Sequence, residues 1–144
     1  MRIISGNLKG RNIDFIKSEI TRPLKDSVRE SIFNIISHSN LLDINLINAN
    51  VLDLYSGVGS FGLECLSRGS NKITFVEKDN KALDFLNKNL FNLSLQEKAR
   101  VVNNEIINFL STELNEKYEI IFLDPPFLDS EYIKILEMIY KKNI

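Results

Sequence analysis

The sequence predicts an α/β domain in which a mostly parallel sheet is covered by helices on both faces. From residue 51 onward, short apolar runs alternate with segments whose apolar residues recur at helical spacing. The first run is followed by a Gly-x-Gly-x-x-Gly turn at residues 57–62, and the second run ends on the acid Glu77. Apolar runs without polar alternation are typical of parallel strands buried on both faces. A length of 144 residues predicts one domain.

Composition narrows the functional classes. Hydrophobic residues make up 44% and charged residues 26% of the chain, as in ordinary globular proteins. One cysteine and one histidine exclude a disulfide framework and leave no Cys/His metal cluster, so no metal is expected. We see neither a signal peptide nor an apolar run long enough to span a membrane, which predicts a cytoplasmic protein.

Charge is distributed unevenly along the chain. The net charge of −1 argues against a general nucleic-acid coat. Residues 1–30, however, hold seven basic and four acidic residues, against eleven basic and fifteen acidic residues in the remainder. This basic segment could steer a phosphate backbone, and an ordinary solvated surface is an equal alternative.

The N-terminal 40 residues predict a hairpin followed by a helix. Residues 2–15 contain two β-like runs around a Gly/Asn turn, and Pro23 then breaks any regular element. Ser27 and Glu30 have capping-box spacing, and apolar residues at helical spacing continue to about His38. A polar linker at residues 40–50 leads onward. We therefore expect an N-terminal extension over 1–40 and a core over 41–144.

Strand and helix alternate through the core. The predicted strands cover residues 51–54, 73–77, 100–103 and 118–123. The predicted helices cover residues 63–68, a stretch capped by Asp79, a short segment at 106–110, and a last segment capped by Ser130.

The glycine turn has the features of a ligand-binding loop. Gly57 and Gly59 permit a tight turn in which backbone N–H groups approach a ligand, while Gly62 lets helix and strand pack closely. Asp53 precedes the turn, and Glu77 stands where an acid can hold the two hydroxyls of a ribose. The alternative for Glu77 is a solvated acid at a strand end.

A second motif, Asp124-Pro125-Pro126-Phe127, follows the last predicted strand. The two prolines lack N–H donors, so the loop offers acceptors only. Together with the Asp124 carboxylate and the flat face of Phe127, it suits a planar base that carries an exocyclic amine. The alternative is a turn that buries a phenylalanine.

With these residues, the chain resembles class I S-adenosylmethionine-dependent methyltransferases of the [DN]PP[FY] type. It is most similar to the RsmD family, which methylates N2 of a guanine in 16S ribosomal RNA. The matching stretches are residues 2–6, 9–11, 21–23, 28–30, 52–54, 56–59, 63–64, 66–69 and 122–127. Cys65 stands where the family usually has alanine, and we expect it to be a small buried helix residue.

The resemblance implies a Rossmann-like fold with sheet order 3-2-1-4, and S-adenosylmethionine as cofactor. Because the family continues with further strands, we expect the strand at 118–123 to be an exposed edge. On that reading this chain is short of a working enzyme, with weak activity, low stability or self-association.

The resemblance also assigns roles. The cofactor would contact Asp53, Ser56, Gly57, Gly59, Glu77, and either Asn104 or Glu105. Asp124 and the Pro125 carbonyl would accept the hydrogens of the amine, beside Pro126, and Phe127 would clamp the flipped base. The RNA would contact Lys9 and Arg11. It would also contact Arg22 and Arg29, which are alternatively candidates for binding the cofactor carboxylate. Arg29 could equally pair with Asp26 or Glu30. The expected partner is 16S rRNA within an assembling small subunit, with no membrane involved.

Three other functions stay open. The nearest is an amino-methyltransferase of another RNA or of DNA, acting on adenine N6, since the Asp-Pro-Pro-aromatic loop serves that amine as well. A nicotinamide-dependent oxidoreductase also uses Gly-x-Gly-x-x-Gly, although Asp53 and the 124–127 loop disfavour it. The third is a non-catalytic binding module or a fragment.

Overall fold

The computed structural model describes residues 1–15, 25–39, 44–112, 114–126 and 129–144, so the predicted site residues Arg22 and Phe127 lie outside it. Its centre is a four-stranded parallel sheet with the order β3-β2-β1-β4, as predicted. The strands are β1 Asn50–Leu54, β2 Lys72–Glu77, β3 Ala99–Asn103 and β4 Ile120–Leu123.

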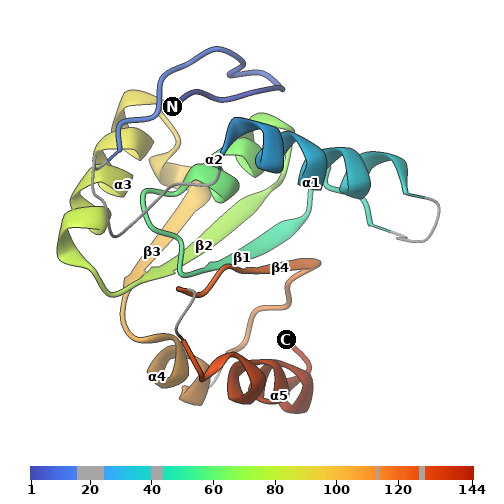
Figure 1. Cartoon of the computed structure of the whole chain (residues 1–144), viewed down its shortest axis with the longest axis vertical. Coiled ribbons are helices and arrows are strands. Elements are labelled where there is room, and N and C mark those ends of the chain that lie inside the picture. The colour runs from blue at the N-terminus through green and yellow to red at the C-terminus, as the bar shows by residue number, and fades with distance from the viewer. Residues whose placement is uncertain (16–24, 40–43, 113, 127–128) are drawn as a thin grey trace.

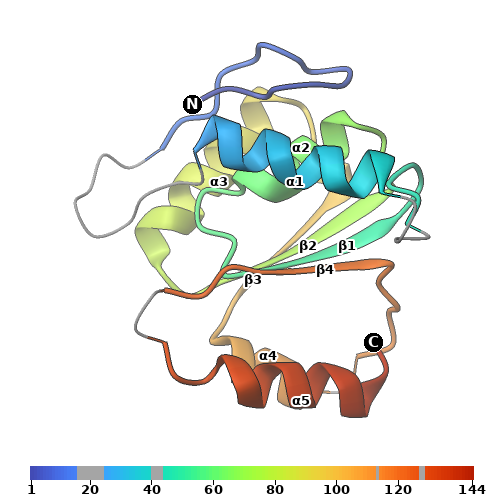
Figure 2. The same ribbon diagram turned by 45° about the vertical axis from the view of Figure 1, so that its right-hand side comes forward.

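Helices cover both faces of the sheet, as Figures 1 and 2 show. One layer holds α1 Asp26–His38, α2 Ser60–Ser67 and α3 Asn80–Asn92. The other holds α4 Ile106–Ser111 and α5 Tyr132–Lys142. A 3₁₀ turn, Gln96–Lys98, leads into β3. None of the helices in the described ranges is long and apolar enough to cross a membrane.

The hydrophobic core is divided by the sheet into two clusters. Successive residues of β1 point to opposite faces, so Val51 joins the cluster under α1, α2 and α3, and Leu52 joins the one under α4 and α5. Both faces are therefore apolar, which explains the unbroken apolar runs in the sequence. All eight residues of α2 are buried, including Cys65 as expected.

The N-terminal segment pairs its two runs as the predicted hairpin does, over a short length. Residues 1–15, which we call the N-terminal arm, form one antiparallel bridge, between Arg2 and Asn12. Beside it, the N–H of Ile3 donates to the Arg11 carbonyl and the N–H of Ile13 donates to the Met1 carbonyl, each at 2.9 Å. The backbone N–H groups of Ile4 and Ser5, which follow the paired residues, donate to the carboxylate of Glu64 on α2. These bonds attach the arm to the helix layer.

Helix starts agree with the sequence only in part. The Asp79 side chain accepts from the N–H of Ala82 and caps α3 as predicted. The capping box at Ser27 is wrong, because α1 begins at Asp26 after Lys25, with no side-chain cap. The cap predicted at Ser130 is also wrong, since Glu131 occupies the N-cap position of α5 and its side chain makes no cap bond.

Strand β4 forms one edge of the described sheet, as expected. It is less buried than an unbroken apolar run implies. Ile120 is buried, whereas Ile121, Phe122 and Leu123 are half-buried, because the strand pairs only with β1.

Candidate active site

The two predicted motifs meet at one edge of the sheet. Leu54, the last residue of β1, lies in register with Val76 of β2 and Leu123 of β4. The glycine loop, Glu77 and Asp124 follow these positions directly. The carboxyl ends of the parallel strands therefore place these groups at one edge of the sheet. In open α/β sheets, ligands bind in the crevice outside this edge.

The glycine loop is held in a backbone shape that few residues adopt. Gly57 and Gly59 have φ of +54° and +85°, in the left-handed region. The loop is tied to β2 by the N–H of Ser56, which donates to the carbonyl of Val76 at 3.1 Å. Gly62 is needed for close packing, since a Cβ there would lie 2.3 Å from the Phe75 ring. The predicted reason for that glycine is confirmed.

Asp53 is a buried carboxyl group at the base of the crevice. It is 1% exposed and accepts the N–H of Gly62 at 3.0 Å. Its pKa is raised to about 8, chiefly by burial and also by the negative charges of Asp124 and Glu77, against the Gly62 hydrogen bond. Two neighbouring carboxylates thus act on the buried Asp53 electrostatically. No ion pair among the described residues includes any of them.

Glu77 connects the second strand to the glycine loop. One of its carboxylate oxygens accepts the N–H of Gly57 at 2.8 Å. The other accepts the N–H groups of Lys78 and Asp79 at 2.8 and 2.9 Å. Its position at the end of β2 is thereby fixed beside the turn, where an acid can reach a ribose.

Asn104 and Glu105 lie next to Glu77 after β3. The N–H of Asn104 donates to the Glu77 carbonyl at 3.1 Å, and its side-chain oxygen accepts the N–H of Glu105. Glu105 is exposed at the N-cap position of α4, and its carboxylate lies 3.4 Å from Nζ of Lys78. Both residues border the crevice, and the choice between them stays open.

The Asp124 loop is joined to the glycine loop by a contact that the sequence did not predict. The hydroxyl of Tyr55 donates to the Asp129 carboxylate at 2.6 Å, and the Asp129 N–H donates to the Pro126 carbonyl at 2.8 Å. Tyr55 has φ of +60°, a strained conformation for a tyrosine at a strand end. The only sequence feature that could have marked Tyr55 as part of the site is its position directly before the glycine motif. Desolvation by partial burial raises the pKa of Asp124.

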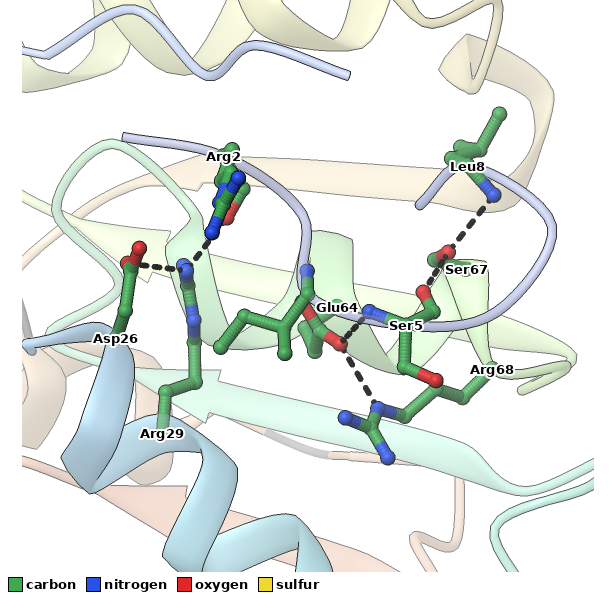
Figure 3. Close-up of polar contacts among 9 residues, drawn as sticks. Arg2, Ser5, Leu8, Asp26, Arg29, Glu64, Ser67 and Arg68 are labelled. Atoms are coloured by element: carbon green, nitrogen blue, oxygen red, sulfur yellow. Dashed lines mark hydrogen bonds and ion pairs between the residues drawn. The ribbon is translucent and has the colours of Figure 1, made fainter. Parts of the chain in front are cut away.

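The predicted RNA-binding residues fall into two environments. Lys9 and Arg11 are exposed on the arm, and Arg11 donates to the Asn92 carbonyl at 2.9 Å. Arg29 is fully buried and donates to the Asp26 carboxylate and to the Arg2 carbonyl, as Figure 3 shows. Of the two acids that the sequence offered as partners for Arg29, the structure therefore pairs it with Asp26.

Comparison with known proteins gives a consistent family. The family described as "Conserved hypothetical protein 95" matches residues 1–144. "Ribosomal RNA small subunit methyltransferase D" of Haemophilus influenzae is 38% identical over 129 residues, covering 88% of this chain and 64% of the relative. The protein of the same name in Escherichia coli K12 is 37% identical over 140 residues, covering 95% of this chain and 67% of the relative. The chain thus spans about two thirds of the length of these relatives. The solved structure of yhhF from Escherichia coli has a TM-score of 0.83 at 32% identity and covers 99% of this chain and 72% of its own.

Proposed function

Because this chain belongs to the RsmD family, whose relatives are named methyltransferases, we propose that it transfers a methyl group from S-adenosylmethionine to small-subunit ribosomal RNA. The finer proposal is that the acceptor is the exocyclic N2 amine of a guanine in 16S rRNA. The observation that supports methyl transfer to an exocyclic amine is that Glu77, the glycine loop and the Asp124-Pro-Pro loop lie together at one edge of the sheet.

The negative side chains around the crevice suit the positive charge of S-adenosylmethionine. S-adenosylmethionine, when bound, supplies a methyl group on a positively charged sulfonium. Asp53, Glu77 and Asp124 are negative when ionised, and the charges of Asp124 and Glu77 help to raise the pKa of Asp53. A cationic ligand would supply the opposite charge that the buried Asp53 lacks among the described residues. The residues present therefore fit this cofactor.

The same charge disfavours a nicotinamide cofactor. Its pyrophosphate is an anion, and the carboxylates of Glu77 and Asp124 beside the crevice would repel it. Titration with S-adenosylhomocysteine and, separately, with NADH distinguishes the two functions. We expect saturable binding of S-adenosylhomocysteine alone, and binding of NADH alone would reject the proposal.

The Asp124 loop would orient the acceptor amine. The lone pair of an exocyclic amine is delocalised into the base, so the amine is a poor nucleophile. Asp124 and the Pro125 carbonyl would accept its two hydrogens and align the lone pair with the methyl group. Adenine N6 of DNA or of another RNA is the alternative acceptor. Methylation of unmodified small subunits, against naked duplex DNA, separates these substrates.

The basic arm would contact the RNA. Its turn exposes Lys9 and Arg11 on the same side of the sheet as the helix that follows the glycine loop. We take residues 1–40 as the RNA-facing extension and 41–144 as the cofactor-binding core. The substrate would be an assembling small subunit, which places the activity in the cytoplasm.

Replacing Glu77 by alanine tests the cofactor site. The change removes a charged acceptor for two ribose hydroxyls, and we expect binding of S-adenosylhomocysteine to weaken by about 1–3 kcal/mol. Isothermal titration measures it. Glu77→Gln, which keeps one oxygen acceptor, should fall between this variant and the unaltered protein. An unchanged dissociation constant in Glu77→Ala would show that the acid serves only the loop.

Reversing the charge of Lys9 and Arg11 to glutamate tests the arm. We expect weaker binding to ribosomal RNA and a shallower dependence on salt, by about one unit of slope for each lost phosphate contact. Affinity for S-adenosylhomocysteine should not change. The matched control is Lys134→Glu with Lys141→Glu on α5, on the opposite face of the sheet. An unaltered salt slope in the arm variant would exclude the arm as the contact surface.

A further inference from the structure

Asn89 on α3 joins two parts of the molecule that the proposed function keeps separate. It is 1% exposed, and its side-chain oxygen accepts the N–H of Asp14 at 2.8 Å. Its side-chain nitrogen donates to the carbonyl of Asp14 at 2.9 Å and to the carbonyl of Val58 at 3.2 Å. One amide thus uses its acceptor and both of its donors.

The chemistry of these three bonds requires an amide. Asp14 presents one donor and one acceptor, and Val58 presents an acceptor, so the side chain must accept once and donate twice. A carboxylate in this place would face two carbonyl oxygens with no hydrogen to donate. An apolar side chain would leave the buried Val58 carbonyl and both half-buried Asp14 groups without these bonds.

The two backbone segments that Asn89 holds have different roles. Asp14 belongs to the N-terminal arm, and its carboxylate also lies 2.9 Å from Nζ of Lys88. Val58 lies in the glycine loop, between Gly57 and Gly59. The arm is also attached to α2, the helix that this loop begins. Ser67 Oγ accepts the N–H of Leu8 and donates to the Ser5 carbonyl (Figure 3).

We propose that Asn89 is a positioning residue that ties the N-terminal arm to the cofactor loop, so that cofactor binding fixes the arm and with it the bound RNA. The inference rests on the proposed function, because it takes the loop as the cofactor site and the arm as the RNA contact. Methyl transfer depends on the relative position of donor and acceptor, and a displacement of about 1 Å can cost about a hundredfold in rate. Asn89 would act on that distance without touching either substrate.

Hydrogen exchange of the unaltered protein tests the link directly. On saturation with S-adenosylhomocysteine, the amides of Gly57 and Gly59 should exchange more slowly, and the Asp14 amide should slow by about fivefold or more along with them. The control is the Glu119 amide, which bonds to Asn50 at the opposite end of the sheet and should not change. Protection of the loop without protection of Asp14 would overturn the link alone. Protection of neither would overturn the link and the proposed cofactor together.

Substitution of Asn89 gives the second test. In Asn89→Asp, kcat on small ribosomal subunits should fall about tenfold, while the dissociation constant of S-adenosylhomocysteine stays within about threefold. The rate is expressed per protein molecule that binds S-adenosylhomocysteine, so that a smaller folded fraction does not lower the measured kcat. Asn87→Asp, an exposed neighbour on the same helix, should match the unaltered protein. An unaltered kcat per site in Asn89→Asp would overturn the proposal. If that variant does not fold, the exchange experiment decides alone.

Discussion

Replacing Asp124 by alanine should reduce methyl transfer by about two orders of magnitude, the scale seen when one preorganised catalytic contact is lost. The loop would keep the Pro125 carbonyl but lose the charged acceptor that aligns the amine. Cofactor affinity should change little, because the other two carboxyl groups remain. Single-turnover methylation, compared with S-adenosylhomocysteine titration, measures both quantities. Unaltered turnover would remove Asp124 from the mechanism.

The acid side of the pH profile gives a second measure of the same group. Partial burial raises the pKa of Asp124, so its carboxylate takes up a proton at a higher pH than an ordinary aspartate. The acceptor is present above that pKa and is lost as the pH falls through it. The rate should therefore decline on the acid side, and Asp124→Ala should lack this decline.

Replacing Glu64 by alanine should lower the free energy of unfolding by about 3–5 kcal/mol, the cost of removing one partner of a buried ion pair. Glu64 is 0% exposed, and one of its oxygens accepts from Nε of Arg68 at 2.8 Å. Its carboxylate also accepts the N–H groups of Ile4 and Ser5 at 2.8 and 2.9 Å (Figure 3). The substitution leaves the Arg68 charge and both arm donors without that partner.

Urea denaturation measures the effect of Glu64→Ala. The matched control is Glu97→Ala, because Glu97 is exposed on the 3₁₀ turn and should alter stability by less than about 0.5 kcal/mol. If Glu64→Ala cost no more than the control, the carboxylate would not be what holds the arm on α2.

The sheet and the edge that carries the site could be predicted because their signals are local. Each strand is a short, mainly apolar run; Glu77 ends one of them and Asp124 directly follows another. Parallel strands place their carboxyl ends together, so the crevice follows from the order of the elements. The cap at Asp79 was predictable for the same reason, since cap and helix are adjacent in sequence.

The contacts that shape the arm could not be predicted, because each joins residues far apart in the chain. Glu64 lies sixty residues from the Ile4 amide that it accepts, and Asn89 lies seventy-five residues from Asp14. A β-like pattern at residues 2–15 gives no sign that a helix carboxylate will take its donors. The Tyr55–Asp129 bond is equally distant in sequence and likewise leaves no periodic pattern.

The most direct test of the account is methyl transfer by the purified protein to small ribosomal subunits that lack this modification. Labelled methyl from S-adenosylmethionine should enter 16S rRNA, and nuclease digestion with mass spectrometry should recover it as N2-methylguanosine. Label recovered on adenine N6, or on duplex DNA in preference to the subunit, would contradict the proposed acceptor. Binding of S-adenosylhomocysteine with no transfer to any of these substrates would contradict the catalytic role of this chain.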